Sequence, residues 1–152
     1  MQKWFECKVK YDKMMENGVV KTVTEPYLVD ALSFTEAEAR IIEEMQPYIN
    51  GGEFLVTAVR RMNLTDIFYN QTGDRWYKVK TNFITIDEKT AVEKKTAQFQ
   101  MVQASEFSEA LKVFMEGMKD SMADFEIASI TETMIMDVFQ VDLRSKAEKE
   151  QQ

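Results

Sequence analysis

Apolar and polar residues alternate along two segments of the chain, one at its start and one near its middle. Residues 3–11 place Phe5, Cys7 and Val9 between residues that are mostly charged. Residues 75–83 show the same alternation. A period of two residues is typical of a strand that buries one face and exposes the other. Each segment is therefore predicted to be a half-buried strand.

A turn signal follows each of these strands. Asn17-Gly18 supplies the positive φ angles of a two-residue hairpin turn, so the first strand is predicted to fold back onto residues 19–31. The second strand is followed by Asp-Glu-Lys-Thr at residues 87–90, which is a weaker turn signal. A hairpin with a longer loop is expected there.

Two segments have the spacing of amphipathic helices. In the first, Ser33 and Glu36 fit a capping box, and apolar residues follow at helical spacing as far as Met45. The second begins near Ser105 and carries a broader apolar face up to Met118. Each helix is predicted to lay its apolar face on a sheet.

A strand-like run follows each helix, and a shorter run follows that. The longer runs are residues 54–59 and 125–130, and the shorter ones are residues 66–69 and 135–141. The order strand, strand, helix, strand and short strand indicates the α+β class, with an antiparallel sheet and helices packed on it.

This order occurs twice because the chain resembles itself. Trp4 matches Trp76, Phe34 matches Phe107, and the residues between them correspond in order. Such a match predicts two pseudo-symmetric repeats of strand, strand, helix, strand and short strand within one compact domain. The predicted divisions are repeat one at residues 1–70, a loop at 71–74, repeat two at 75–144 and a polar tail at 145–152.

Several segments carry a resemblance to a known family. They read WFECKVKYDK, VTEPYLVDALSFTEAEARIIEEM, GDRWYKVK, MADFEIASI and MDVF. With them the chain resembles DUF4494, a domain of unknown function found mainly in Bacteroidetes and their phages, over nearly its whole length. The resemblance implies a cytoplasmic protein of phage or mobile-element origin. It implies no activity, substrate or catalytic residue.

Composition removes several classes of enzyme. The chain of 152 residues has 19 Lys and Arg against 26 Asp and Glu, for a net charge of −7, and it has no histidine. Ser-His-Asp, Cys-His and zinc-histidine sites are therefore excluded. Cys7 is the only cysteine, so neither an internal disulfide nor a thiolate metal site is expected. We expect no cofactor, no membrane span and a cytoplasmic location.

An aromatic and basic stripe is predicted on the solvent face of the first strand of each repeat. Aromatic rings that stack on bases, with lysines that follow phosphates, are typical of proteins that bind single-stranded nucleic acid. The same residues also suit a protein interface or a charged sheet edge, and the net charge of −7 favours that interpretation. The candidate residues are Trp4, Lys8, Lys10, Trp76, Lys78 and Lys80.

Asp66 and Asp137 occupy matching places before the two short strands. A pseudo-two-fold axis could bring them together as a catalytic pair or a cation site, although an aspartate at the start of a short strand more often caps a turn. The glycines form no phosphate-binding loop.

The sequence therefore predicts a non-catalytic binding protein. We expect an accessory or regulatory factor that acts on a protein partner or associates with itself through an exposed sheet face or edge. Single-stranded nucleic-acid binding through the stripe is the alternative, and an enzyme built on Asp66 and Asp137 has the least support.

Overall fold

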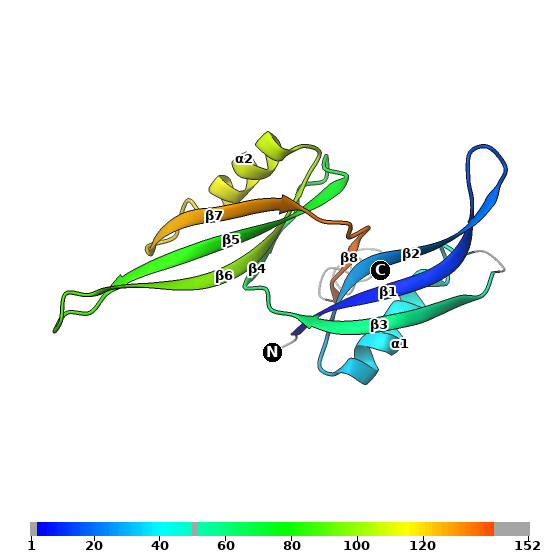
Figure 1. Cartoon of the computed structure of the whole chain (residues 1–152), viewed down its shortest axis with the longest axis horizontal. Helices are drawn as coiled ribbons and strands as arrows, with labels where there is room; N and C mark the ends of the chain where they lie inside the picture. Colours follow the sequence, from blue (N-terminus) through cyan, green and yellow to red (C-terminus); the bar gives the residue numbers. More distant parts are fainter. Residues whose placement is uncertain (1–2, 50–51, 142–152) are drawn as a thin grey trace, which may run out of the picture. The chain divides into compact units, whose positions relative to one another are not determined.

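A computed structural model of the chain describes residues 3–49 and 52–141, which form eight strands and two helices (Figure 1). The chain divides into two compact units. Unit 1 consists of the described residues of Met1–Asn63 and Met134–Gln152, and unit 2 of Leu64–Thr133. Each unit has a sheet and a helix of its own, and each is described by itself.

Unit 1 contains a four-stranded sheet in the order β3-β1-β2-β8. The strands are β1 (Lys3–Met14), β2 (Val20–Ala31), β3 (Phe54–Met62) and β8 (Val138–Phe139). β1 pairs antiparallel with β2 and β3, while β8 runs parallel to β2. Helix α1 (Phe34–Met45) packs on the face that presents the buried residues of β1 and β2, so this face forms the core.

Unit 2 has the same architecture, with its sheet in the order β4-β6-β5-β7. The strands are β4 (Asp66–Phe68), β5 (Arg75–Ile86), β6 (Glu93–Ala104) and β7 (Asp124–Glu132). β5 pairs antiparallel with β6 and β7, and β4 runs parallel to β6. Helix α2 (Phe107–Gly117) packs against β4, β6 and β7. The expected α+β class is confirmed, with sheets that are largely antiparallel.

Each short strand joins the sheet of the other unit, not the sheet of the strand that precedes it in the sequence. β4 follows β3 in the sequence but pairs with β6 of unit 2, and β8 follows β7 but pairs with β2 of unit 1. The unit boundaries consequently differ from the divisions at residues 1–70 and 75–144. Gly117 fits this arrangement, because an added Cβ would lie 2.6 Å from the Phe68 ring of β4. The C-terminal end of α2 and strand β4 thus approach closely.

The first hairpin has a longer turn than Asn17-Gly18 suggested. Met15 donates from its backbone N–H to the carbonyl of Val19 at 2.8 Å, and Gly18 donates to the carbonyl of Met15 at 2.9 Å. Gly18 has a φ of 83°, which glycine adopts without steric cost. The loop therefore spans three residues. A two-residue turn of the expected type needs two residues with positive φ, and here only Gly18 has one. The β5–β6 hairpin has the longer loop that was expected.

Both helices begin with a carboxylate that accepts from the preceding backbone. The Ser33 hydroxyl accepts from the N–H of Glu36 at 3.2 Å, and the Glu36 carboxylate accepts from the N–H of Leu32 at 3.4 Å. In unit 2, Glu109 accepts from the N–H of Ser105 at 2.9 Å. The bond from Glu36 satisfies a donor of the first helical turn, and the two carboxylates satisfy donors just before the N-caps.

Candidate functional site

The predicted stripe reaches the surface in unit 1. Lys8 and Lys10 are exposed on β1 and Trp4 is half-buried. Their face also carries Glu6, which forms an ion pair with Arg60 of β3 at 3.2 Å. The field of this face is therefore mixed in sign.

The corresponding residues of unit 2 are arranged differently. Trp76 is only 2% exposed, and its ring meets that of Tyr69 edge to face, with the centroids 5.7 Å apart. The Lys78 ammonium lies 4.6 Å from the centroid of the Phe99 ring, and Lys80 is exposed. The expectation that Trp76 offers a solvent-exposed stacking surface is thus not met, because this side chain packs instead of facing solvent.

The two candidate aspartates belong to different units. Asp66 opens β4 in unit 2 and is exposed. Asp137 precedes β8 in unit 1, is half-buried, and its carboxylate accepts from the N–H of Val138 at 2.8 Å. Their role as a catalytic or cation-binding pair stays a prediction.

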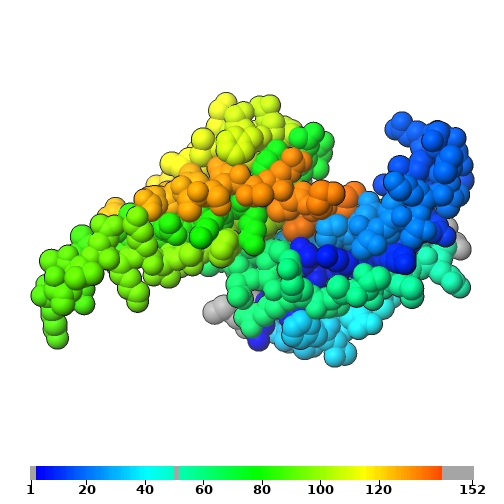
Figure 2. Space-filling view, viewed as in Figure 1, coloured from blue at the N-terminus to red at the C-terminus, as the bar shows by residue number. Residues whose placement is uncertain are grey.

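Helix α2 carries an exposed apolar stripe that the sheet does not cover. Ala110 and Phe114 are buried beneath the helix, whereas Phe107, Leu111 and Met115 are 57%, 38% and 47% exposed. Their spacing of four residues places them in one row along the helix. The surface of α2 is the yellow-green segment in Figure 2. We call Phe107, Leu111 and Met115 the α2 stripe.

The matching row on α1 is interrupted by charge. Phe34 packs its ring edge to face against Phe5, with the centroids 4.9 Å apart. Glu38 and Ile42 follow at the positions that Leu111 and Met115 occupy on α2. An unbroken row of apolar side chains is thus a property of α2 and not of α1.

Unit 1 contains a pocket of about 230 Å³ beside β1, β2 and β8. Its charged lining consists of two carboxylates, Glu25 and Asp137, and the ammonium of Lys13. Its aromatic lining comes from Tyr11, Tyr27, Tyr48 and Phe139. We call it the tyrosine pocket.

Contacts inside the tyrosine pocket fix the position of Glu25, which is 9% exposed. Its carboxylate accepts a hydrogen bond from the Tyr11 hydroxyl and lies 3.6 Å from the Lys13 ammonium. The Tyr27 and Phe139 rings stack with their centroids 5.9 Å apart. Burial, and then the bond to Glu25, raise the pKa of Tyr11 to about 12. Burial and the nearby Glu25 charge also raise the pKa of Tyr27, so both phenols stay neutral and remain hydrogen-bond donors.

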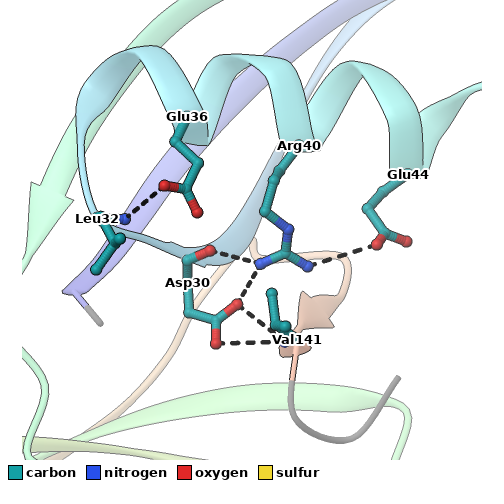
Figure 3. Close-up of polar contacts among 6 residues, drawn as sticks. All are labelled: Asp30, Leu32, Glu36, Arg40, Glu44 and Val141. Carbon is teal, nitrogen blue, oxygen red and sulfur yellow. Dashed lines mark hydrogen bonds and ion pairs between the residues drawn. The ribbon is translucent and has the colours of Figure 1, made fainter. Parts of the chain in front are cut away.

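A buried ion pair joins three elements of unit 1 (Figure 3). Arg40 of α1 donates to the carboxylate and to the backbone carbonyl of Asp30 in β2. The same carboxylate accepts from the N–H of Val141, which follows β8, at 3.0 Å. Glu44 lies 3.5 Å from the far side of the guanidinium. Because these groups satisfy one another, we interpret the cluster as structural.

In unit 2 the corresponding sheet position carries a neutral side chain. Gln103 occupies the register position of Asp30, since Trp76 pairs with Gln103 as Trp4 pairs with Asp30. The Gln103 side-chain oxygen accepts from the N–H of Asn70, just beyond β4, at 3.0 Å. The segment after each short strand is thus hydrogen-bonded to one polar side chain of the adjacent strand, β2 in unit 1 and β6 in unit 2.

Other possible sites gain no support from the described part of the chain. Residues 3–49 and 52–141 contain no group of three or more acidic or cysteine side chains placed to hold a metal ion. Cys7 is fully buried in the core of unit 1, and burial raises the pKa of its thiol to about 12. No helix among the described residues is long and apolar enough to span a membrane.

Comparison with known families identifies a match that covers most of the chain. The family described as Domain of unknown function (DUF4494) matches residues 3–141. The chain belongs to this family. The matched range of DUF4494 includes both units and both short strands. No curated protein and no solved structure was found to match this DUF4494 chain.

Sequence reasoning missed both the α2 stripe and the tyrosine pocket. The broad apolar face of α2 was predicted to pack on the sheet, but only Ala110 and Phe114 are buried and the Phe107, Leu111 and Met115 side of that face is exposed. A signal for the pocket existed in the column of core-facing residues. Glu25 lies two residues before Tyr27 and so faces the same side of the strand, toward the core. A carboxylate buried there needs a hydrogen-bond or ion-pair partner, because burying an unpaired charge is unfavourable.

Proposed function

We propose that this DUF4494 chain is a non-catalytic binding protein whose α2 stripe docks onto another protein. The observation that supports the proposal is the row of three apolar side chains exposed along one helix. Contiguous apolar surface on a soluble protein is typical of an interaction site. The role that fits is an accessory or regulatory factor in the cytoplasm, of phage or mobile-element origin.

The partner surface that fits is apolar with basic residues around it. The chain has a net charge of −7, and Glu106 is exposed beside Phe107 at the start of the α2 stripe, whereas Glu116 near its end is paired with Lys119 at 2.6 Å. Opposite charge around an apolar contact speeds association and disfavours partners of the wrong sign.

We also propose that the two parts of the chain arose as pseudo-symmetric repeats. Support comes from the repeated element order, from the equal strand register at Trp4 and Trp76, and from the matching helix starts. On this view a common framework has acquired different surfaces, with the α2 stripe in unit 2 and the tyrosine pocket in unit 1.

A capture experiment tests the docking surface. The tagged full chain is used in cells that encode it, and bound proteins are compared between the wild type and Leu111→Glu. Val92→Glu is the matched control, because Val92 is 60% exposed on the β5–β6 hairpin and receives the same change. We expect Leu111→Glu alone to lose a defined partner. Equal capture by all three proteins would contradict the proposal.

Sedimentation velocity of the purified chain then identifies the kind of partner. A dimer that Leu111→Glu dissociates would make the partner a second copy, while a monomer would assign it to a different protein.

A further inference from the structure

The tyrosine pocket combines features that suit one chemical class of ligand. Aromatic faces attract cations through the ring quadrupole, and aromatic cages are the common recognition site for quaternary ammonium groups. Tyr11, Tyr27, Tyr48 and Phe139 provide four rings, and Glu25 and Asp137 provide two carboxylates. The volume of about 230 Å³ lies below the range of sites for drug-sized ligands, so it suits a head group.

The pocket already holds an ammonium group of the chain itself. The Lys13 Nζ lies 3.6 Å from a Glu25 oxygen, and the Lys13 side chain is 44% exposed. The pair is open to solvent on its lysine side only, and such a partly screened contact contributes little free energy, so a better-fitting cation can displace the Lys13 ammonium. Asp137 forms no ion pair within the described residues, and it leaves the lining with one negative charge in excess.

The corresponding positions of unit 2 do not carry this chemistry. Phe83, Thr85, Gln98 and Gln100 occupy the register positions of Tyr11, Lys13, Glu25 and Tyr27. Gln100 is fully buried, accepts from the Thr81 hydroxyl at 2.7 Å and donates to Thr65 at 3.0 Å. A closed hydrogen-bond network thus replaces the tyrosines and carboxylates. The two units share a framework and differ at the pocket, as expected if the pocket is a binding site in unit 1 only.

We infer that the tyrosine pocket of unit 1 binds an organic ammonium head group, quaternary or methylated, between its aromatic rings and the carboxylates of Glu25 and Asp137. Such a head group occurs on small molecules such as choline and on methylated lysine side chains of proteins. The site is separate from the α2 stripe, and the inference does not depend on the proposed function.

Titration of the full chain with choline tests the inference, with the amide and tyrosine NMR signals of unit 1 as the readout. The control ligand is the neutral analogue in which carbon replaces the choline nitrogen. We expect choline to bind about tenfold more tightly than this analogue, which is the range of a desolvated cation–π contact. Equal binding of the two, or no saturable shift with choline, would overturn the inference.

Two variants with opposite expected effects separate binding from folding. Asp137→Asn should weaken choline binding, whereas Lys13→Gln should strengthen it about threefold, because the competing internal ammonium is gone. Lys21→Gln is the matched control, since Lys21 pairs with Lys13 across the strands and does not line the pocket. We expect this control to match the wild type. A Lys13→Gln protein that binds no more tightly than Lys21→Gln would overturn the inference, whatever its stability.

Peptides distinguish the two sources of the ligand. A trimethyl-lysine peptide is compared with its unmodified form and with free choline. Tighter binding of the methylated peptide than of choline would assign the pocket to a protein ligand, and equal binding would assign it to the head group alone. Preference for the unmodified peptide would contradict the inference.

Discussion

At the residue scale, the Asp30–Arg40 contact is the main buried ion pair of unit 1. Asp30 is 3% exposed and serves α1 and the segment after β8 together. A buried pair of this kind adds little stability over an apolar replacement, but loss of one partner leaves a charge without compensation. Its main contribution is therefore to fix which segments meet.

Arg40→Met should destabilise unit 1 by about 3 kcal/mol, because the Asp30 carboxylate is left buried. Cys7 provides the readout, since the only cysteine lies in that core and reacts only when unit 1 opens. We expect labelling by a thiol reagent to accelerate roughly 100-fold. Arg60→Met, which breaks the exposed pair with Glu6, should change it by less than about fivefold. Similar rates for both variants would show that the buried pair has no special role.

A pH dependence follows from the same core. Burial raises the pKa of the Cys7 thiol from 9.0 to about 12, so the folded state holds the proton more tightly than the unfolded state. The stability this provides is complete below about pH 9 and is lost as the pH rises toward 12. Urea midpoints followed by circular dichroism should therefore fall above pH 9, and fall less steeply in Cys7→Ala. Identical slopes in the two proteins would refute this assignment.

At the element scale, the exchange of the short strands determines how each sheet is completed. β8 brings Phe139 against Tyr27 in unit 1, and β4 brings Phe68 against Phe114 in unit 2. Each unit therefore depends on a strand that lies next to the other unit in the sequence.

Phe139→Ala should consequently destabilise unit 1, and Phe68→Ala should destabilise unit 2. Each removes a half-buried ring, at a cost on the order of 2 kcal/mol. Phe139→Ala should accelerate amide hydrogen exchange in β1 and β2, and Phe68→Ala should accelerate it in β5 and β6. Each variant is the control for the other. Faster exchange in β1 and β2 after Phe68→Ala, with β5 and β6 unchanged, would rule out the exchange of strands.

The sequence allowed the elements to be predicted but not the partners of the short strands. Period-two alternation predicted β1 and β5, and the Ser33 capping box predicted the start of α1, because these signals are local. β4 and β8 have three and two residues, too few to encode a partner, and their pairing depends on distant contacts. The α2 stripe was missed for a related reason. Sequence shows that Leu111 and Met115 are apolar, but it does not show how wide a face the sheet covers.

At the scale of the whole molecule, two units with one framework carry different surfaces. On β1 the predicted stripe has exposed lysines and a half-buried Trp4, whereas on β5 Trp76 is 2% exposed and Lys78 is half-buried. The nucleic-acid alternative therefore has support from one unit only, whereas the α2 stripe is an uninterrupted apolar row.

A fluorescence titration separates these two functions. We expect single-stranded DNA or RNA to leave tryptophan fluorescence unchanged at low salt, because Trp76 is packed and the face around Trp4 has mixed charge. Quenching that weakens as salt rises, and that disappears in Trp4→Phe, would favour nucleic-acid binding instead.

The most direct test of the proposed function is photo-crosslinking at two matched helix positions. A photoreactive amino acid replaces Leu111 on α2 or Glu38 on α1 in the full chain, and both proteins are irradiated in cells that encode them. We expect a discrete crosslinked protein from position 111 and none from position 38, because only α2 presents an unbroken apolar row. The same products from both positions, or none from position 111, would contradict the proposal that the α2 stripe is a docking surface.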